Sequence, residues 1–174
     1  LMAFVIANRR LRAKPDDEYN KDGGVTAILR YTLRLLTTQQ RDRITKMILA
    51  AEMIRSRETP KYGTEPISIG FWVGGGVTPN SFDDLKEDSE DPEKTSRARS
   101  QKRLIHKQLL TCPFCGKSLQ QNDAKENITD LTFNIDIPRK AVDIYCLDKD
   151  CIFYKYSPHK MKIPVYLVDE EIYA

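Results

Sequence analysis

Apolar residues recur at helical spacing in two parts of the chain. Residues 1–12 place apolar side chains on one side and end in three arginines, which suits the negative end of a helix dipole. Residues 35–57 carry a second apolar stripe, and both stretches are predicted to be amphipathic helices. The positions of the second stripe are Leu36, Ile44, Met47, Ile48, Ala51 and Ile54.

Two continuous apolar runs flank the second helix. Val25–Tyr31 and Ile67–Val73 have the length and composition of buried strands. A strand, a helix and a strand in this order predict a right-handed parallel crossover, and therefore the α/β class.

The pattern changes to short segments after residue 109. Residues 131–137 alternate between apolar and polar, as in a half-exposed strand, and residues 142–145 and 163–168 read as two further strands. We therefore expect a small ribbon of short strands inserted before the chain returns to its sheet. The predicted organisation is an α/β segment over 1–81, a charged helix or linker over 82–108, the ribbon over 109–160 and a return strand over 161–174.

The composition and the order of residues limit the classes of protein to which this chain can belong. No apolar run approaches the ~18 residues that span a bilayer, and the first residues lack the order of a signal peptide. We expect a soluble cytoplasmic protein without a membrane partner. The first residue is not Met and the first helix starts abruptly, which predicts a fragment of something larger.

Charge is unevenly distributed along the chain. Residues 82–93 hold seven acids and one lysine, whereas residues 94–107 hold six basic residues and no acid. Such blocks are usual for solvated faces, and a net charge of +3 does not by itself indicate nucleic-acid binding.

Four cysteines form two close pairs. Cys112 and Cys115 are separated by two residues, and Cys146 and Cys151 by four. Two such knuckles, thirty residues apart, predict one tetrahedral site that holds a structural Zn²⁺. An iron–sulfur cluster or a redox dithiol is the alternative, and His106 and His159 are interpreted as surface histidines rather than ligands.

The junction between the first strand and the second helix is a candidate phosphate site. Backbone N–H groups and hydroxyls at a helix start hold anions, and Arg34 adds charge there. An ordinary N-terminal cap followed by a basic helix explains the same residues, and both interpretations stay open.

The segment Thr32-Leu33-Arg34-Leu35-Leu36-Thr37-Thr38-Gln39 resembles the motif Ia segment of superfamily 2 helicases, which holds nucleic-acid phosphates. Arg34, Leu36 and Gln39 match that motif, and Thr32, Leu33 and Thr37 depart from it. The phrases "GGVTAILRYTLRLLTTQQRDR", "ISIGFWVGGGVTPN", "CPFCG" and "IPVYLVDEEIY" together resemble the large helicase-like proteins of bacterial anti-phage DISARM systems.

This resemblance implies part of a first RecA-like lobe that carries a zinc-ribbon insertion. Its implied partners are nucleic acid, with DNA expected, the rest of the helicase chain and other defence-system subunits. ATP and Mg²⁺ would bind only in the longer parent protein, because no G-x-x-x-x-G-K-[ST] loop occurs in this sequence. The implied nucleic-acid contacts are Thr32, Arg34, Thr37, Thr38, Gln39, Gly74 and Gly75.

Two other interpretations complete the set. Asp169, Glu170 and Glu171 resemble a Walker B carboxylate pair, although an acidic turn that caps the next helix is favoured. Aromatic residues around the knuckles (Phe114, Phe153, Tyr154 and Tyr156) suggest instead a zinc-ribbon module that docks onto proteins, or simply a small packed core. An independent enzyme is disfavoured, because the sequence contains no evident pair of nucleophile and base.

Overall fold

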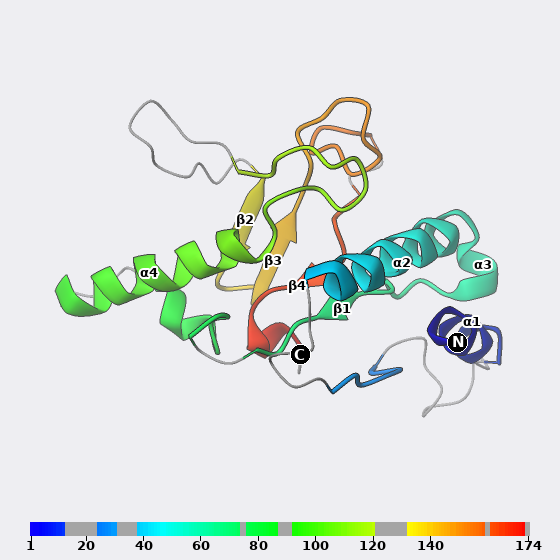
Figure 1. Ribbon diagram of the computed structural model, residues 1–174, viewed down its shortest axis with the longest axis horizontal. Coiled ribbons are helices and arrows are strands. Elements are labelled where there is room, and N and C mark those ends of the chain that lie inside the picture. Colours follow the sequence, from blue (N-terminus) through cyan, green and yellow to red (C-terminus); the bar gives the residue numbers. More distant parts are fainter. Residues whose placement is uncertain are drawn as a thin grey trace. The chain divides into compact units, whose positions relative to one another are not determined.

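The computed structural model describes residues 1–12, 24–30, 38–73, 76–86, 92–120, 132–158 and 161–172 of the chain. These residues form a mixture of helices and short strands, drawn in Figure 1. The chain divides into two compact units, residues 1–68 and residues 69–174. No helix in the described part of the chain combines the length and apolarity needed to cross a membrane.

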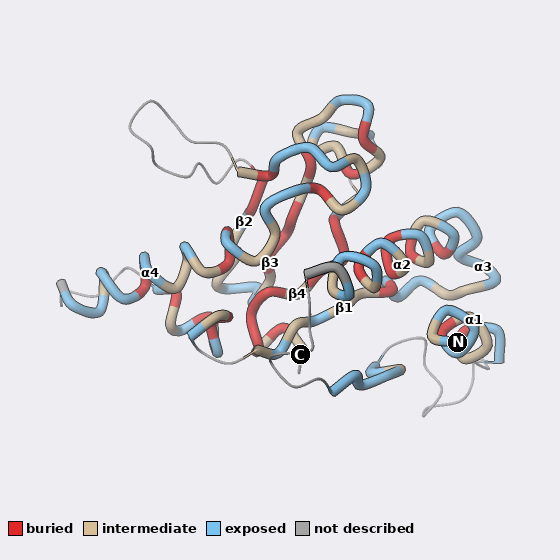
Figure 2. Tube along the Cα trace, in the orientation of Figure 1, coloured by how far each residue is buried: buried red, intermediate tan, exposed pale blue. Residues whose placement is uncertain are grey.

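The first unit consists of helices α1 (Met2–Arg12), α2 (Thr38–Arg57) and α3 (Thr59–Tyr62). The helices predicted over 1–12 and 35–57 are present over residues 2–12 and, in the described part of the second, over residues 38–57. In α2, buried positions recur on one side of the helix (Figure 2), where Ile48 and Leu49 are almost fully buried. The packed face differs from the predicted apolar stripe, of which Ile48 is buried and Ile54 is exposed. The other buried positions of the helix are Thr45, Leu49, Glu52 and Arg55.

A buried ion pair organises the end of α2. The Arg55 guanidinium donates two hydrogen bonds of 2.7 Å to the carboxylate of Glu52. It also donates to the carbonyl oxygens of Gly63 and Thr64, at 2.9 and 3.1 Å. The same Glu52 carboxylate accepts the backbone N–H of Ile67 at 2.7 Å. The pair thus fixes the segment that follows α3 to the helix.

The prediction of a buried strand over residues 25–31 is wrong for its described part. Residues 25–30 have no strand pairing, and Val25, Ile28 and Leu29 are exposed. Arg9 of α1 holds this segment through hydrogen bonds to the Val25 carbonyl and the Thr26 hydroxyl, both 2.8 Å. A strand needs a hydrogen-bonded neighbour, and the described part of this unit supplies none to the segment.

The second unit contains a small parallel sheet. Strand β1 (Ile69–Gly70) pairs with β4 (Val165–Tyr166), so that Ile69 lies beside Val165 and Gly70 beside Tyr166. The predicted runs 67–73 and 163–168 are therefore strands at their centres. Their parallel partner comes from the far end of the chain and not from residues 25–31.

The second sheet is an antiparallel hairpin of β2 (Phe133–Asp136) and β3 (Ala141–Ile144). Its turn places Lys140 at φ 52° and uses the Asp136 carboxylate to accept the Arg139 N–H at 3.0 Å. On β3, buried Asp143 accepts hydrogen bonds from Arg139 and, at 2.6 Å, from Lys162. These two cations lower the pKa of Asp143, although burial alone would raise it.

Two helical elements separate these strands along the chain, η1 (Asp83–Leu85) and α4 (Pro92–Gln108). Thr78, which precedes η1, is buried and donates a 2.9 Å hydrogen bond to Asp169. Helix α4 begins with proline, which is pre-organised for a first helical position. Its inward side buries Ala98, Ile105 and His106.

Candidate metal centre

The first cysteine pair lies in a tight turn directly after α4. The Cys112 N–H donates to the Lys117 carbonyl at 2.7 Å, and the Gly116 N–H donates to the Cys112 carbonyl at 2.8 Å. Gly116 has φ 76°, a left-handed conformation that glycine adopts without the strain of a side chain. The turn brings both sulfur atoms to the same side.

The second pair lies in a turn that follows β3. Here the Cys146 N–H donates to the Phe153 carbonyl, and the Lys155 N–H donates to the Cys146 carbonyl, both at 2.8 Å. Cys151 closes the turn through its N–H, which donates to the Asp148 carbonyl at 3.0 Å. The four residues between these two cysteines therefore form a second hydrogen-bonded loop.

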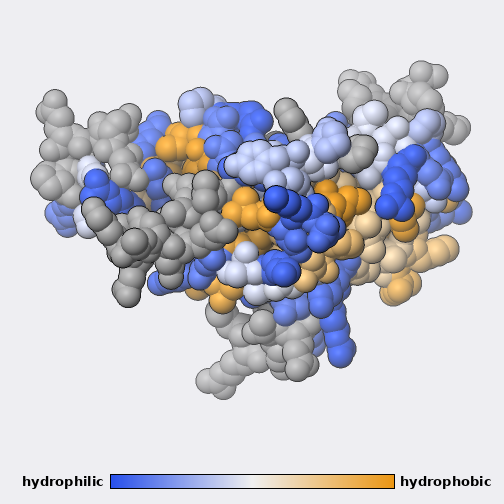
Figure 3. Space-filling view, turned by 90° about the horizontal axis from the view of Figure 1, so that it is seen from above, coloured by the Kyte–Doolittle hydropathy of each residue, from blue (hydrophilic) through white to orange (hydrophobic). Residues whose placement is uncertain are grey.

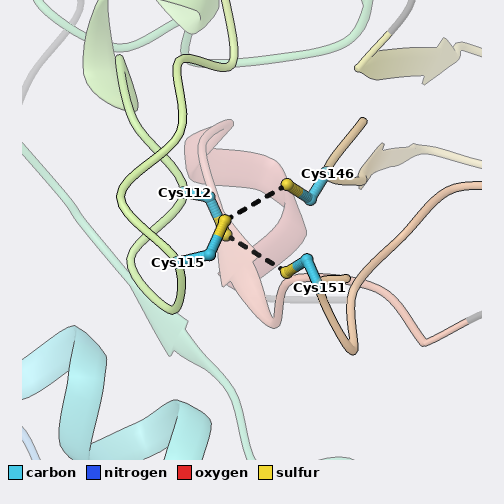
Figure 4. A group of neighbouring side chains, drawn as sticks. All are labelled: Cys112, Cys115, Cys146 and Cys151. Atoms are coloured by element: carbon cyan, nitrogen blue, oxygen red, sulfur yellow. Dashed lines mark hydrogen bonds between the residues drawn. The ribbon is translucent and has the colours of Figure 1, made fainter. Parts of the chain in front are cut away.

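The four sulfur atoms converge on one point, as Figure 4 shows. All lie within 4.8 Å of one another, with 3.8 Å between Cys112 and Cys151 and 3.6 Å between Cys115 and Cys146. A tetrahedral zinc with Zn–S bonds of about 2.3 Å separates its sulfurs by roughly 3.8 Å. A disulfide would require about 2.05 Å, so the spacing fits a metal ion and not a sulfur–sulfur bond.

Backbone N–H groups surround the sulfurs. The Asp148 N–H donates to the Cys146 sulfur at 3.4 Å, and those of Phe114 and Cys115 reach the Cys112 sulfur. Burial nevertheless raises the pKa of the Cys112 thiol to about 12 and also raises those of Cys146 and Cys151. Four thiolates here need a cation to offset their charge, and a divalent metal ion would supply it by displacing the thiol protons.

Cys115 differs from the other three cysteines. It is the half-exposed member of the group. Burial raises the pKa of its thiol, but hydrogen bonds from the Lys117 N–H and from the neighbouring thiols together lower that pKa by more. The net shift is downward. With all four ligand positions provided by protein sulfur, a bound ion would have no open coordination position, which is the arrangement of structural rather than catalytic zinc.

Aromatic residues pack beside the cysteine cluster in two different ways. Phe153 is fully buried and meets the exposed ring of Phe114 edge to face, with 5.9 Å between centroids. Tyr154 and Tyr156 form a second edge-to-face pair at 5.5 Å, in which Tyr156 is exposed. Of the two interpretations of these aromatic residues, Phe153 therefore fits the small packed core, whereas Tyr156 is exposed as a docking surface would require.

The structure places His106 in the core, so the prediction of a surface histidine is wrong. Its ring lies 4.7 Å from that of Phe133, edge to face, at the end of α4. It is not part of the cysteine group. His159 lies outside the described residues.

The acidic turn η2 (Asp169–Ile172) connects several segments of the second unit through hydrogen bonds to its carboxylates. The Glu171 carboxylate accepts N–H groups from Val142 of β3 at 2.6 Å and from Leu167 and Val168 at 3.0 and 3.2 Å. The bonds to Leu167 and Val168 go to residues just before the turn, and the capping of a following helix stays a prediction. The bond to Val142 also ties the hairpin to the end of β4, which only the folded chain reveals.

The other two carboxylates of η2 are equally engaged. Asp169 accepts the Thr78 hydroxyl, and Glu170 accepts the Phe82 N–H at 2.9 Å and the Lys140 ammonium at 2.5 Å. Burial raises the pKa of both Asp169 and Glu171. Carboxylates that serve as hydrogen-bond acceptors for the protein itself do not form an open Mg²⁺ site, which disfavours the Walker B interpretation.

The predicted nucleic-acid contacts fall where the structure gives no side-chain account. Thr32, Arg34, Thr37, Gly74 and Gly75 lie outside the described residues. Thr38 and Gln39 form the first turn of α2, but their side chains are likewise outside the description. These contacts remain predictions.

Basic side chains form an exposed face on α4. Arg99, Arg103 and Lys107 follow one another at intervals of four residues and are all exposed. This spacing puts them on one side of the helix, opposite buried Ala98 and Ile105. Arg97 lies outside this face and approaches Asp84 of η1 to 4.0 Å.

Comparison with known proteins adds one relative. No family model matches the sequence. The chain is 42% identical over 179 aligned residues to the DISARM protein DrmA of Bacillus paralicheniformis. The match covers 99% of this chain. The chain is similar to a segment of a DISARM protein.

The relative is much longer than this chain, which spans 14% of its length. The similarity over the whole chain supports the DISARM resemblance seen in the sequence. The activity and partners of the longer protein are therefore only proposed for this chain.

Proposed function

We propose that this chain is a zinc-stabilised, nucleic-acid-binding segment of a helicase-like motor lobe in an anti-phage DISARM protein. The observation that carries the proposal is the four-sulfur cluster, which has the spacing of a tetrahedral zinc site. It occurs in a chain that matches a segment of a DISARM protein over 99% of its own length. The name of that relative supports the defence role, and the cluster supports the metal chemistry.

Zinc has a structural role in this proposal. It joins the turn after α4 to the turn after β3, two segments that the sequence separates by about thirty residues. Small ribbons have too little apolar surface to fold alone, and a metal ion provides the missing free energy. The ion would be held by Cys112, Cys115, Cys146 and Cys151.

Nucleic-acid contacts are assigned to two parts of the chain. The motif Ia-like segment offers Thr32, Arg34, Thr37, Thr38 and Gln39, and the glycine-rich turn adds Gly74 and Gly75. The α4 face of Arg99, Arg103 and Lys107 adds contacts to phosphates, which are independent of base sequence. DNA is the expected partner, in the bacterial cytoplasm.

The motor itself requires more than this chain. In a RecA-like lobe, the loop that cradles ATP and the carboxylate that holds Mg²⁺ would come from other parts of the long protein. The carboxylates of η2 are bonded within this chain, which supports assigning Mg²⁺ elsewhere. We expect no ATP hydrolysis by the isolated chain.

DNA binding at two salt concentrations tests the proposal. The zinc-loaded chain should bind single- and double-stranded DNA, and the affinity should fall as salt rises. Each phosphate contact on duplex DNA contributes about 0.9 to the slope of log K against log salt. Arg103→Ala with Lys107→Ala should therefore lower the slope by roughly 2, and Arg34→Ala by about 1.

The control is Lys61→Ala, which removes an exposed lysine that pairs with Glu58. It should leave the slope unchanged. A chain that holds zinc but binds neither form of DNA would refute the nucleic-acid part of the proposal. Binding that is indifferent to Arg34→Ala would remove the motif Ia assignment alone.

A protein-docking ribbon is the second candidate function. The exposed rings of Phe114 and Tyr156 beside the cysteine cluster favour it. A partner captured by the chain and lost on Tyr154→Ala, which removes the ring packed against Tyr156, would support docking. Capture that is unchanged in that variant would exclude this surface.

A further inference from the structure

The four cysteines of the cluster differ in their access to solvent. Cys112, Cys146 and Cys151 are buried, with at most 4% of each residue exposed, whereas Cys115 is only partly buried. Cys115 also follows Phe114, one of the exposed apolar residues of the ribbon. A small dissolved molecule therefore reaches Cys115 more readily than it reaches the other three cysteines.

Backbone hydrogen bonds add to this difference in the first pair. The Cys112 sulfur accepts the N–H groups of both Phe114 and Cys115, whereas the Cys115 sulfur accepts the backbone N–H of Lys117. Hydrogen bonds to a thiolate stabilise its charge and make it a weaker nucleophile. Of the two sulfurs in this pair, Cys112 is therefore both the more buried and the more strongly stabilised by the backbone.

A second sulfur lies close enough to Cys115 to complete an oxidation. The Cys146 sulfur is 3.6 Å from that of Cys115, and the two residues come from different turns of the ribbon (Figure 4). A disulfide needs about 2.05 Å, so these sulfurs must approach each other by roughly 1.5 Å. Cys112 and Cys151 form a similar pair at 3.8 Å, but both of them are buried.

We propose that Cys115 is a modification site, at which a peroxide oxidises the zinc-loaded cluster to a Cys115–Cys146 disulfide and so releases the metal ion. The inference rests on the zinc part of the proposed function and adds a reaction to the same residues. A bound metal ion keeps cysteine sulfurs deprotonated, and the thiolate is the form that reacts with oxidants. Susceptibility to oxidation follows exposure, which selects Cys115.

The reaction balances with one molecule of hydrogen peroxide. The Cys115 thiolate attacks one peroxide oxygen, so that an S–O bond forms, the O–O bond breaks and hydroxide leaves. The Cys146 thiolate then attacks the Cys115 sulfur, forms the S–S bond and expels the second hydroxide. The two thiolates together give up two electrons, which reduce the peroxide, and two protons from the solvent convert both hydroxides to water.

The disulfide preserves the connection between the two turns after the metal ion has left. Cys112 and Cys151 are then the cysteines still available as ligands, fewer than the four of a structural zinc site. Cys115 belongs to the turn after α4 and Cys146 to the turn after β3, so the new bond joins the same segments that the metal ion joined. Oxidation thus exchanges one cross-link for another, and a thiol reductant with added zinc reverses the exchange.

Peroxide treatment of the reduced, zinc-loaded chain tests the proposal. A colorimetric zinc indicator should show the loss of one zinc per chain, and the intact mass should fall by two hydrogen atoms relative to the reduced, metal-free chain. Peptide mapping without reduction should place the disulfide between Cys115 and Cys146 and find Cys112 and Cys151 still open to alkylation. Dimedone, which traps sulfenic acids, should label Cys115 before any other cysteine.

Two matched variants separate attack at Cys115 from the general loss of a ligand. Cys115→His and Cys151→His each leave three cysteines and one histidine, a ligand set that structural zinc sites also use. Cys115→His removes the accessible thiolate, so zinc release by peroxide should slow several-fold. Cys151→His keeps both Cys115 and Cys146, so the same disulfide should form, at a rate no lower than in the unaltered chain.

Several results would overturn the modification site and leave the proposed function intact. These are first labelling of a buried cysteine, a disulfide between Cys112 and Cys115, equal rates in the two variants, or retention of zinc after the methionines of the chain have been oxidised to sulfoxides. If either variant fails to bind zinc, the dimedone label and the mapped disulfide of the unaltered chain decide alone. A chain that holds no zinc before peroxide is added would refute the zinc part of the proposed function as well.

Discussion

The two units of this chain stabilise themselves by different means. Among the described residues, the first buries four large apolar side chains almost completely, Ile6, Ile48, Leu49 and Ile67, and depends on the buried pair of Glu52 and Arg55. The second buries apolar side chains from α4, both sheets and the ribbon, and gathers four cysteines within them.

Exposed surface shows the same contrast. The first unit leaves Phe4, Leu11, Val25 and Ile28 exposed, whereas the larger apolar residues of the hairpin and ribbon are mostly buried. In Figure 3, hydrophobic side chains reach the surface in separate patches among hydrophilic ones on the face shown. A polar network therefore supports the first unit, where apolar burial is sparse, whereas the second unit combines apolar burial with a four-cysteine cluster and buried carboxylates that accept backbone hydrogen bonds.

Removing one of the four cysteines should have the largest effect on stability, and it should affect the second unit alone. Structural zinc contributes on the order of 10–16 kcal/mol of binding free energy in small zinc domains. Cys112→Ser should abolish stoichiometric zinc and expose the amides of residues 109–120 and 141–156 to rapid hydrogen exchange. The amides of α2 should remain protected, because all four cysteines of the group lie in the second unit.

Lys117→Ala is the control for this variant, since it alters an exposed side chain within the same turn and should retain zinc. Loss of protection in α2 together with the ribbon would show that the two units fold as one.

Breaking the ion pair of the first unit should have the next largest effect. Glu52→Ala leaves Arg55 buried without its carboxylate and removes the acceptor of the Ile67 N–H. Removing one partner of a buried pair costs about 3–5 kcal/mol. Urea denaturation monitored by the α2 amides should show this loss, whereas Lys61→Ala, in an exposed pair, should scarcely change the transition.

Gly70→Ala should destabilise the parallel sheet by a smaller amount. A Cβ at Gly70 would lie 2.6 Å from Cγ1 and 2.8 Å from Cδ1 of Ile172. Overpacking of this kind costs about 1–3 kcal/mol. Thermal unfolding should show the loss, and the same change should cost much less in an Ile172→Ala background, where both clashing atoms are absent.

Gly76→Ala provides the comparison for a glycine with open space around it and should be tolerated. An equal loss at both glycines would mean that chain flexibility, rather than contact with Ile172, explains the effect.

Asp143→Asn should give the smallest effect and a characteristic pH dependence. Because Lys162 and Arg139 lower the folded pKa of Asp143 despite its burial, its ionised form stabilises the fold. That contribution is present above the unfolded pKa of about 3.9 and is lost as pH falls through the lower folded value. The stability gap between the two chains should be flat from pH 8 to about 5 and narrow below about 4.

Zinc content must be measured at each pH in that comparison, because acid also protonates the thiolates. A gap that widens as the pH falls would contradict the assignment of Asp143.

Sequence patterns predicted the local features well. The apolar stripe located α2, and the two cysteine pairs identified the residues that the fold brings together. Both signals are short in range: helical periodicity depends on neighbours three or four residues apart, and knuckle spacing depends on a single turn.

Features that depend on distant partners were harder to predict. Residues 25–30 have the composition of a strand but lack a neighbour in the described structure, while β1 finds its partner almost a hundred residues later. Burial of His106 and Phe153 and the bond from Glu171 to Val142 likewise depend on the folded hairpin. No local pattern encodes these contacts.

Zinc K-edge X-ray absorption on the purified chain tests the central claim most directly. The account predicts one zinc per chain with four sulfur neighbours at about 2.3 Å and no nitrogen or oxygen ligand. Chain that lacks bound metal and carries its cysteines as disulfides, or zinc bound by fewer than four sulfurs, would contradict it.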